Sequence, residues 1–249
     1  MNEYLIKIKE KGFEAFFVGG YVRDYLLKRK TFDIDIATNA SLNDLTIIFK
    51  DTKFKCNDWC LTIINEPYKI QITPYRIEEK YEDYRHPSKI EKTQNIFEDS
   101  KRRDFTINAL YQDENGMIYD FYNGIKHLKE KKLVMIGDAN KRLKEDPLRI
   151  LRALRFSSIY DFAFERNLDD AIIKNKELLT KVSSFRKKQE LEKIYEYGDI
   201  QIIRKYDLQK YFYLEEHYKK GKDIYEFWKQ VDISKYPFTK EELKRIKET

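Results

Sequence analysis

The chain has 249 residues, enough for two small domains or one extended one. Its 49 Lys and Arg against 43 Asp and Glu give a net charge of +6, which favours positive patches over a uniformly basic surface. Because no apolar run approaches the roughly 20 residues that span a bilayer, and no secretory leader is visible, we expect a cytoplasmic protein with no membrane partner. Cys56 and Cys60 are expected to be reduced, and without a second ligand pair they are a weak metal signal.

The first part of the chain alternates short helical and strand patterns. Some segments repeat apolar residues at helical spacing, whereas others alternate apolar and polar residues. Ser41 and Asp44 have the spacing of a capping box, which predicts the start of a helix. The predicted helices span residues 1–12, 21–28 and 41–49, and the predicted strands span residues 16–18, 32–37, 59–64 and 68–73, the last two paired across Pro67.

The later part of the chain is mainly helical in pattern. Residues 78–93 are polar without clean periodicity, so we expect a mobile loop there. Residues 105–111 begin as a helix, and residues 117–120 form a strand pattern. From Asp138 onward helical spacing continues without a convincing strand. We therefore predict an α+β fold, with a mixed α/β part at residues 1–136, helices at 137–197 and a short helical region at 198–249.

Asp33 and Asp35 are the candidate catalytic residues and metal ligands. On a strand, side chains at i and i+2 point to the same face, so the two carboxylates lie side by side and repel. A hard cation such as Mg²⁺ takes oxygen ligands and removes that conflict. Gly19-Gly20 upstream lets backbone amides approach an anion, and the helix after it adds positive potential. Together these features indicate a site for a metal-bound triphosphate, although Asp-x-Asp alone would more simply be a solvated strand face.

A second set of candidate residues follows Asp146-Pro147. Proline at the first helical position, with Asp before it, is typical of a helix start. Arg149, Arg152 and Arg155 then recur every third residue and form a polar stripe. Taken alone, this stripe is more simply a solvated basic face.

Several ordered motifs carry a family resemblance. The first is Phe17-Val-Gly-Gly-Tyr-Val-Arg-Asp-Tyr-Leu-Leu with Asp33-Ile-Asp-Ile-Ala-Thr, and the second is Arg102-Arg-Asp-Phe-Thr-Ile-Asn-Ala-Leu. Asp120 and Gly124 follow, then Glu145-Asp-Pro-Leu-Arg-Ile-Leu-Arg-Ala-Leu-Arg-Phe, and a weaker match at residues 182–191. Over about residues 13–195 the chain resembles class II tRNA nucleotidyltransferases, the CCA-adding enzymes and their poly(A) polymerase relatives in the DNA polymerase β superfamily. Rare motifs in a fixed order make this resemblance specific.

The resemblance implies a nucleotidyltransferase head, a helical neck with a base-reading helix, and a reduced body. Asp146 and Arg149, with Glu145, would form a protein template that hydrogen-bonds the Watson–Crick edge of cytosine or adenine. Arg152 and Arg155 would face phosphate or help to hold Asp146. The nucleotide-binding residues that it implies are Gly19, Gly20, Arg23 (triphosphate), Arg103 (nucleotide), Asp104 (ribose hydroxyl), Asn108, Glu145, Asp146, Arg149, Arg152 and Arg155.

The activity that the resemblance implies is template-independent addition of CCA to the 3′ end of tRNA. CTP and ATP would be the substrates, Asp33 and Asp35 would hold two Mg²⁺ ions, and pyrophosphate would be released. A full-length segment at residues 75–87 resembles the family's flexible loop and favours CCA addition over A-only addition, with poly(A) synthesis third. A catalytically silent RNA-binding relative and a small-molecule nucleotidyltransferase are the alternatives. The intact metal and template residues argue against the first, and a base-reading helix argues against the second.

Four positions and the length depart from the family pattern. Tyr21 replaces a small residue, Gln71 stands where the family strand often carries an acid, and His127 and Phe185 replace acidic residues of later motifs. The tail is apparently absent, so the chain is expected to be C-terminally shortened. A homodimer or a second protein could supply the missing tRNA-binding surface, but the sequence does not show one.

Overall fold

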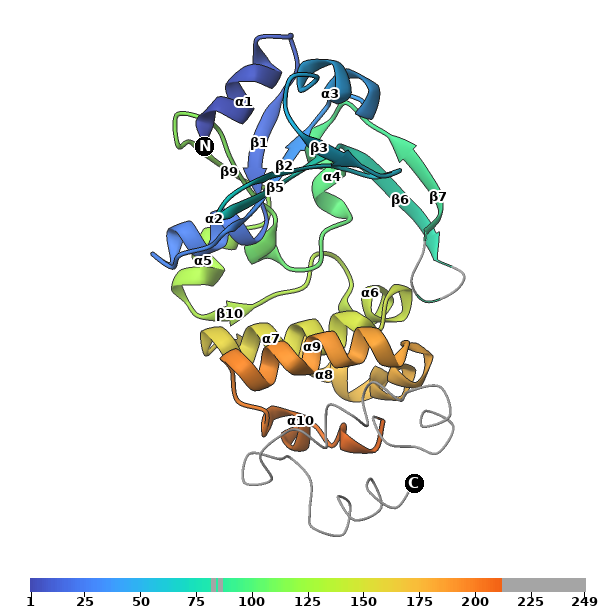
Figure 1. Ribbon diagram of the computed structural model, residues 1–249. Helices are drawn as coiled ribbons and strands as arrows, with labels where there is room; N and C mark the ends of the chain where they lie inside the picture. The colour runs from blue at the N-terminus through green and yellow to red at the C-terminus, as the bar shows by residue number, and fades with distance from the viewer. Residues whose placement is uncertain (82–83, 85–86, 212–249) are drawn as a thin grey trace. The chain divides into compact units, whose positions relative to one another are not determined.

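The structure is a computed structural model that describes residues 1–81, 84 and 87–211 (Figure 1). It divides into two compact units, the first formed by Met1–Lys80 and Pro87–Glu130, the second by Tyr81–His86 and Lys131–Thr249. The first unit holds a mixed sheet with helices and the second is largely helical, which confirms the predicted α+β class. Among the helices of the described ranges, none is both long and apolar enough to cross a membrane.

A mixed sheet forms the centre of the first unit. In the described residues its strand order is β3-β4-β5-β2-β1-β8-β9. β2 and β5 run parallel, whereas the other neighbouring strands are antiparallel. The strands are β1 (Ala15–Val18), β2 (Asp33–Thr38), β3 (Phe54–Cys56), β4 (Leu61–Asn65), β5 (Tyr68–Pro74), β8 (Leu110–Gln112) and β9 (Ile118–Asp120).

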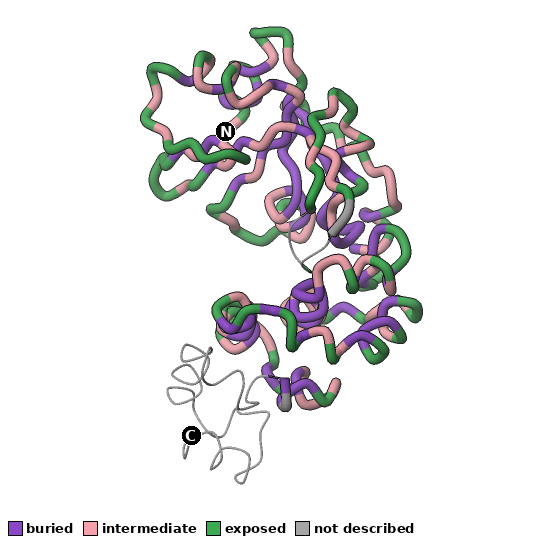
Figure 2. Tube along the Cα trace, turned by 90° about the vertical axis from the view of Figure 1, so that its right-hand side faces the viewer, coloured by how far each residue is buried: buried purple, intermediate pink, exposed green. Residues whose placement is uncertain are grey.

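Helices pack against this sheet and bury its central strands. α1 contacts β1, α2 contacts β1 and β2, and α3 contacts β4. The predicted capping box is present at α3, where the Ser41 hydroxyl and the Asp44 carboxylate each accept the other's backbone N–H. β1 is buried throughout, and Phe16, Val18, Ala37, Tyr75 and Tyr111 form a core cluster (Figure 2). The helices of this unit are α1 (Asn2–Lys9), α2 (Gly20–Leu26), α3 (Leu42–Ile48), α4 (Ile96–Lys101) and α5 (Gly124–Lys129).

Two segments of the first unit differ from the sequence-based expectation. The predicted loop at residues 78–93 contains β6 (Arg76–Tyr81) and β7 (Pro87–Lys92), which pair as a two-stranded sheet, while residues 82, 83, 85 and 86 lie outside the described residues. Exposed charged pairs such as Lys89–Glu79 at 3.6 Å join these strands, so they have no apolar periodicity to detect. The predicted helix at 105–111 is only a 3₁₀ turn, η1 (Thr106–Asn108), before β8, because a short apolar run fits a buried strand equally well.

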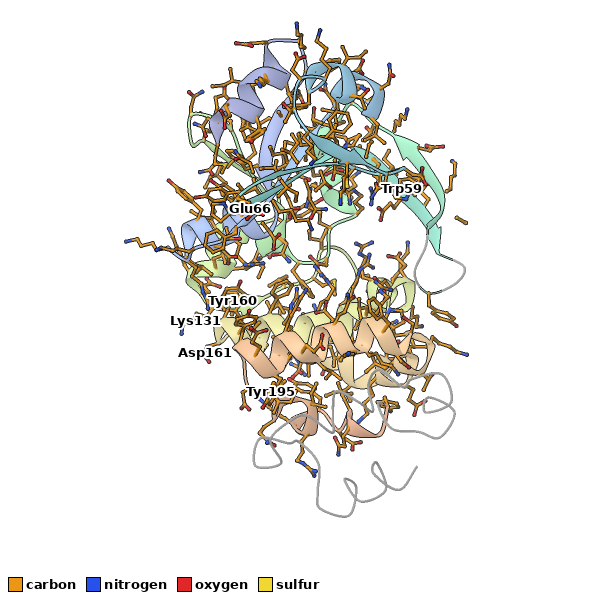
Figure 3. All side chains as sticks on the ribbon, viewed as in Figure 1. Trp59, Glu66, Lys131, Tyr160, Asp161 and Tyr195 are labelled. Atoms are coloured by element: carbon orange, nitrogen blue, oxygen red, sulfur yellow. The ribbon has the colours of Figure 1, made fainter. Side chains whose placement is uncertain are left out.

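Between Lys131 and Tyr211, the described part of the second unit is helical apart from one short parallel strand pair. β10 (Lys132–Leu133) pairs with β11 (Ala163–Phe164), so the expectation of no strand after Asp138 was wrong, because two residues are too few to show a period. At the end of α7, Lys131 Nζ lies 2.9 Å from Asp161 Oδ2 (Figure 3). α7 packs against α9, and α6 against α8. The helices are α6 (Ala139–Glu145), α7 (Leu148–Tyr160), α8 (Arg166–Asn175), η2 (Lys176–Lys181), α9 (Ser184–Tyr197), α10 (Ile202–Lys205) and η3 (Gln209–Tyr211).

The predicted C-terminal region at residues 198–249 is covered only in part. Within it, α10 and η3 agree with a helical pattern up to Tyr211. Residues 212–249 lie outside the described residues.

Gly124 stands where the start of α5 meets η1. A Cβ on Gly124 would lie 2.4 Å from the backbone carbonyl oxygen of Thr106. Because a backbone atom cannot rotate away, we expect Gly124→Ala to lower the free energy of unfolding by about 1–3 kcal/mol in urea denaturation. Lys126→Ala, an exposed change in the same helix, should stay within about 0.5 kcal/mol of the wild type. Equal effects of the two changes would contradict this packing argument.

Candidate functional site

Asp33 and Asp35 lie on β2 in the middle of the sheet. Val18 of β1 is opposite Asp35 on one side, and Gln71 of β5 is opposite it on the other. Asp33 is exposed and Asp35 half-buried, whereas Ile34 between them is buried. The pleat of the strand therefore places both carboxylates on the face away from Ile34.

The turn at Gly19-Gly20 passes close to this pair. Gly19 has φ +72°, and a Cβ there would lie 3.3 Å from Asp35 Oδ2 and 3.8 Å from Arg103 Nη1. A side chain would be strained by that backbone conformation and would crowd the carboxylate. α2 begins directly at Gly20, where a Cβ would lie 3.5 Å from Arg23 Nη2. The fold thus brings both glycines, Asp35, Arg23 and Arg103 into one place.

A buried chain of hydrogen bonds joins α2 to the second motif. Arg23 Nη1 donates to Asn108 Oδ1 at 2.7 Å, and Asn108 Nδ2 donates to Asp104 Oδ1 at 3.0 Å. Arg23 also contacts both carboxylate oxygens of Asp24, at 3.0 and 2.9 Å. Arg23, Asp104 and Asn108 are all buried, so each is held in one orientation. The contacts of Arg23 with a triphosphate and of Asp104 with a ribose stay predictions.

Two residues that the sequence analysis did not select contact Arg103. Arg103 Nε donates to Tyr111 Oη at 2.8 Å, and Arg103 Nη2 lies 3.3 Å from Asp99 Oδ2. Asp99 precedes Arg102 and Arg103 by three and four residues, which is the spacing of facing positions on a helix. That spacing could have indicated from the sequence that Asp99 contacts these arginines. No neighbouring residue in the sequence indicates the contact with Tyr111.

Two departures from the family pattern have partners in the first unit. The Gln71 amide, beside Asp35, donates to Cys60 Sγ at 3.9 Å. His127 Nδ1 lies 2.9 Å from Thr106 Oγ1. Both side chains are therefore bonded to neutral partners. A carboxylate at either position would make different contacts with these partners.

The other predicted residues belong to the second unit. Asp146 lies between α6 and α7, where its Oδ1 accepts from Leu148 N at 3.1 Å and its Oδ2 lies 3.5 Å from Arg186 Nη2 of α9. Pro147 occupies the cap position, and α7 begins at Leu148 rather than at the proline. Arg186 was not selected from the sequence, because only the fold brings α9 to the start of α7.

Arg149 and Glu145 are held together one turn apart. Arg149 is buried, and its Nη1 donates to the Arg142 carbonyl at 2.7 Å and lies 3.2 Å from Glu145 Oε2. Arg142 Nη1 approaches the same Glu145 oxygen to 2.7 Å. These contacts fix the Arg149 guanidinium in place before any ligand arrives.

Arg155 forms a buried ion pair with α9, and its contact with a phosphate or with Asp146 stays a prediction. It is buried, with Nη1 3.0 Å from Glu190 Oε2 of α9, and its guanidinium lies over the Phe156 ring at 4.6 Å. This arginine–carboxylate pair contributes to the packing of α7 against α9. Arg152 is half-buried with its guanidinium 5.6 Å from the same ring.

Lys187 of α9 gives the second unit a pH-dependent stability. It is fully buried, its Nζ donates to the Tyr211 carbonyl at 2.9 Å, and burial lowers its pKa to about 8. The unfolded chain binds this proton more tightly, so stability should rise as pH increases from about 8 towards the ordinary lysine pKa of about 10.4. We expect the free energy of unfolding of the wild type, relative to Lys187→Met, to increase between pH 7 and 10 in urea titrations. A difference that stays constant with pH would contradict titration of Lys187.

The known proteins to which this chain is similar are enzymes of one kind. Residues 15–134 match the model of the poly A polymerase head domain. CCA-adding enzymes of Lactobacillus delbrueckii subsp. bulgaricus and Bacillus licheniformis are 42% and 40% identical to this chain over 191 residues, which is 76% of this chain. The chain spans about half the length of these curated relatives, 48% of each.

Solved structures agree with this comparison. The Bacillus stearothermophilus CCA-adding enzyme in complex with CTP superposes with a TM-score of 0.76 at 28% identity, covering 94% of this chain and 59% of that one. The Thermotoga maritima CCA-adding enzyme complexed with tRNA has a TM-score of 0.72 at 24% identity, covering 99% and 67%, and supports the fold. Over residues 15–134 the chain therefore belongs to the poly A polymerase head domain family, and the relatives that it resembles are CCA-adding enzymes.

Proposed function

We propose that this chain is a CCA-adding tRNA nucleotidyltransferase, which transfers CMP, CMP and AMP to the 3′ end of tRNA from CTP and ATP. The observation that carries this proposal is the close approach of Gly19, Asp35 and Arg103 to one another, with Asp33 on the same face of the strand as Asp35. Carboxylates, a close-approach glycine and a held guanidinium are the groups that a metal-bound triphosphate requires. The relatives named CCA-adding enzymes support the choice of tRNA as acceptor.

The residues present fit magnesium. Across the described residues there is no cluster of three or more His, Cys, Asp or Glu side chains arranged for a metal. Mg²⁺ does not need such a cage, because it is commonly bound by one or two carboxylates together with substrate phosphates. Asp33 and Asp35 would hold it, and Gln71 beside them offers an amide in place of a third carboxylate. When bound, two such ions would lower the pKa of the primer hydroxyl and neutralise the triphosphate.

The other residues of the first unit would bind and orient the nucleotide. The turn at Gly19 admits the phosphates close to the backbone, and Arg103 supplies a positive charge beside Asp35. Asn108, which is bonded to Arg23, and Asp104, which accepts from Asn108, would present donor and acceptor groups to the ribose. No side chain of this set has to act as a nucleophile, because the primer hydroxyl attacks the α-phosphorus.

The residues of the second unit would select the base. Asp146 offers acceptors for the exocyclic amine of cytosine or adenine, and Arg149 offers donors for the adjacent ring nitrogen. Uracil and guanine present the reverse pattern at the exocyclic position. A mismatched base would leave polar groups unpaired, which is the strongest form of discrimination a binding site has.

A product ladder tests the proposal. Purified protein is incubated with tRNAs ending before CCA, after C and after CC, with CTP, ATP or both. A CCA-adding enzyme completes all three acceptors when both nucleotides are present. Extension of the CC acceptor alone would indicate A-only addition, long ATP-dependent products would indicate poly(A) synthesis, and no extension would favour a silent RNA-binding relative.

A further inference from the structure

We propose that Asp99 is a positioning residue that holds Arg103 beside the Gly19 turn and ties it to the first residue of β6. The proposal rests on the proposed function, because Arg103 is a nucleotide-binding residue only within it. Asp99 itself lies in α4 and is fully buried, so it is not a ligand-binding group. Its role would be carried entirely by the residues that it contacts.

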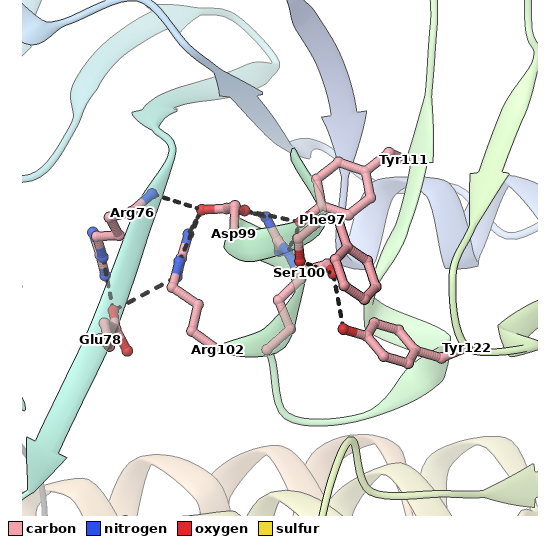
Figure 4. A network of polar contacts seen from close by, with 9 residues as sticks. Arg76, Glu78, Phe97, Asp99, Ser100, Arg102, Tyr111 and Tyr122 are labelled. Carbon is pink, nitrogen blue, oxygen red and sulfur yellow. Dashed lines mark hydrogen bonds and ion pairs between the residues drawn. The ribbon is translucent and has the colours of Figure 1, made fainter. Parts of the chain in front are cut away.

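The two carboxylate oxygens of Asp99 serve two different parts of the unit (Figure 4). Oδ1 accepts from the backbone N–H of Arg76 at 3.1 Å and from Arg102 at 2.9 Å. Oδ2 accepts from Tyr111 Oη at 2.8 Å and lies 3.3 Å from Arg103 Nη2. One oxygen therefore holds the start of β6, and the other holds the arginine of the nucleotide site.

Asp99 remains charged in this buried position. Burial by itself would raise its pKa, but the charges of Arg102 and Arg103 and the hydrogen bonds from Tyr111 and Arg76 lower the pKa below its ordinary value. Burying a carboxylate costs free energy unless both oxygens accept hydrogen bonds or ion pairs. The contacts of Asp99 therefore hold its side chain in the orientation that pairs both oxygens.

Tyr111 fixes the second edge of the arginine. Its hydroxyl accepts from Arg103 Nε at 2.8 Å while it donates to Asp99, and the guanidinium carbon lies 5.0 Å from its ring centroid. Arg103 is thus held through Nε and Nη2, and its Nη1 is the atom that lies 3.8 Å from a Cβ on Gly19. Without these bonds a long, flexible side chain would have to be ordered when the nucleotide binds.

The β6 side of the contact is equally specific. Arg76 Nε donates to Glu78 Oε1 at 2.7 Å, and Arg102 Nη1 lies 3.7 Å from the same oxygen. Arg102 therefore bridges Asp99 and Glu78 across α4 and β6. A shift of the start of β6 would change the contacts of Asp99 Oδ1 and, through the rigid carboxylate, those of Arg103.

The test compares Asp99→Asn, Tyr111→Phe and Ser100→Ala. Ser100 is the neighbour of Asp99 in α4 and is equally buried, but it bonds to Tyr122 at 2.9 Å instead of to Arg103. We expect Asp99→Asn to raise the KM for CTP and ATP, and the Kd for CTP, about tenfold with a smaller change in kcat. Tyr111→Phe should raise them about threefold, whereas Ser100→Ala should lower Tm without moving KM or Kd.

Hydrogen exchange tests the contact between Asp99 and the start of β6. The Arg76 amide should exchange faster in Asp99→Asn and at the wild-type rate in Tyr111→Phe, because only the first variant weakens its acceptor. Unchanged exchange at Arg76 in Asp99→Asn would overturn the link to β6. An unchanged KM and Kd in folded Asp99→Asn would overturn the positioning of Arg103, and Tyr111→Phe decides this point if Asp99→Asn does not fold. A wild type that binds CTP but extends no tRNA would instead refute the proposed function, and the Kd comparison would still test Asp99.

Discussion

Replacing Asp35 with Asn should lower the rate of nucleotide addition by about a thousandfold, and Asp33→Asn should have an effect of the same order. Binding of a catalytic metal supplies several kcal/mol of transition-state stabilisation, and each 1.36 kcal/mol is tenfold in rate. The amide keeps the shape of the side chain but lacks the charge that holds a hard cation. Single-turnover extension of a tRNA ending in CC with ATP measures the rate directly.

This experiment has two controls. One is the same substitution at a carboxylate far from the site, and the other is the free energy of unfolding of the variant. Asp51→Asn, an exposed change after α3, should extend tRNA at the wild-type rate. Asp35→Asn should change the free energy of unfolding by less than about 1 kcal/mol, because it removes both the repulsion from Asp33 and the attraction to Arg103. If both Asn variants on β2 extended tRNA normally while folded, Asp33 and Asp35 would not be the metal ligands.

Local patterns predicted several elements around the Asp33–Asp35 carboxylate pair. The alternation over β2, the apolar run of β1 and the capping box at Ser41 each depend on neighbours within a few residues, and each is present in the structure. The glycine pair was informative because Gly19 directly follows Val18, which pairs with Asp35 across β1 and β2, so the turn lies close to that carboxylate. The amino-acid sequence alone was therefore enough to place the carboxylate pair on a strand beside this turn.

Long-range partners could not be predicted in this way. Glu190 is 35 residues from Arg155, and the sequence contains many acids that might equally have paired with it. Tyr111 lies on β8, so its bond to Asp99 depends on how α4 packs against the sheet. The two strands of the β6–β7 sheet escaped detection because they carry exposed charged side chains, such as the Lys89–Glu79 pair, and show no apolar alternation. The long-range contacts that orient these side chains therefore could not be predicted from a single sequence.

Asp146→Asn should weaken the choice between cytosine and uracil. The carboxylate only accepts hydrogen bonds, whereas an amide also donates and can meet the exocyclic oxygen of uracil. A hydrogen bond to a charged group contributes about 1.5–3 kcal/mol, so kcat/KM for CTP should fall about tenfold to a hundredfold. The ratio of kcat/KM for CTP to that for UTP should fall by at least about tenfold, because UTP gains the partner that CTP loses.

Two further variants serve as comparisons in this measurement. Arg186→Gln removes the contact that orients Asp146, so it should lower kcat/KM for CTP while the site still rejects UTP, since both acceptors remain. Asp170→Asn, an exposed carboxylate of α8, should change neither value. A folded Asp146→Asn variant with the wild-type ratio of CTP to UTP use would place base selection outside Asp146, and Arg149, fixed by Glu145 and the Arg142 carbonyl, would then have to discriminate through its donors alone.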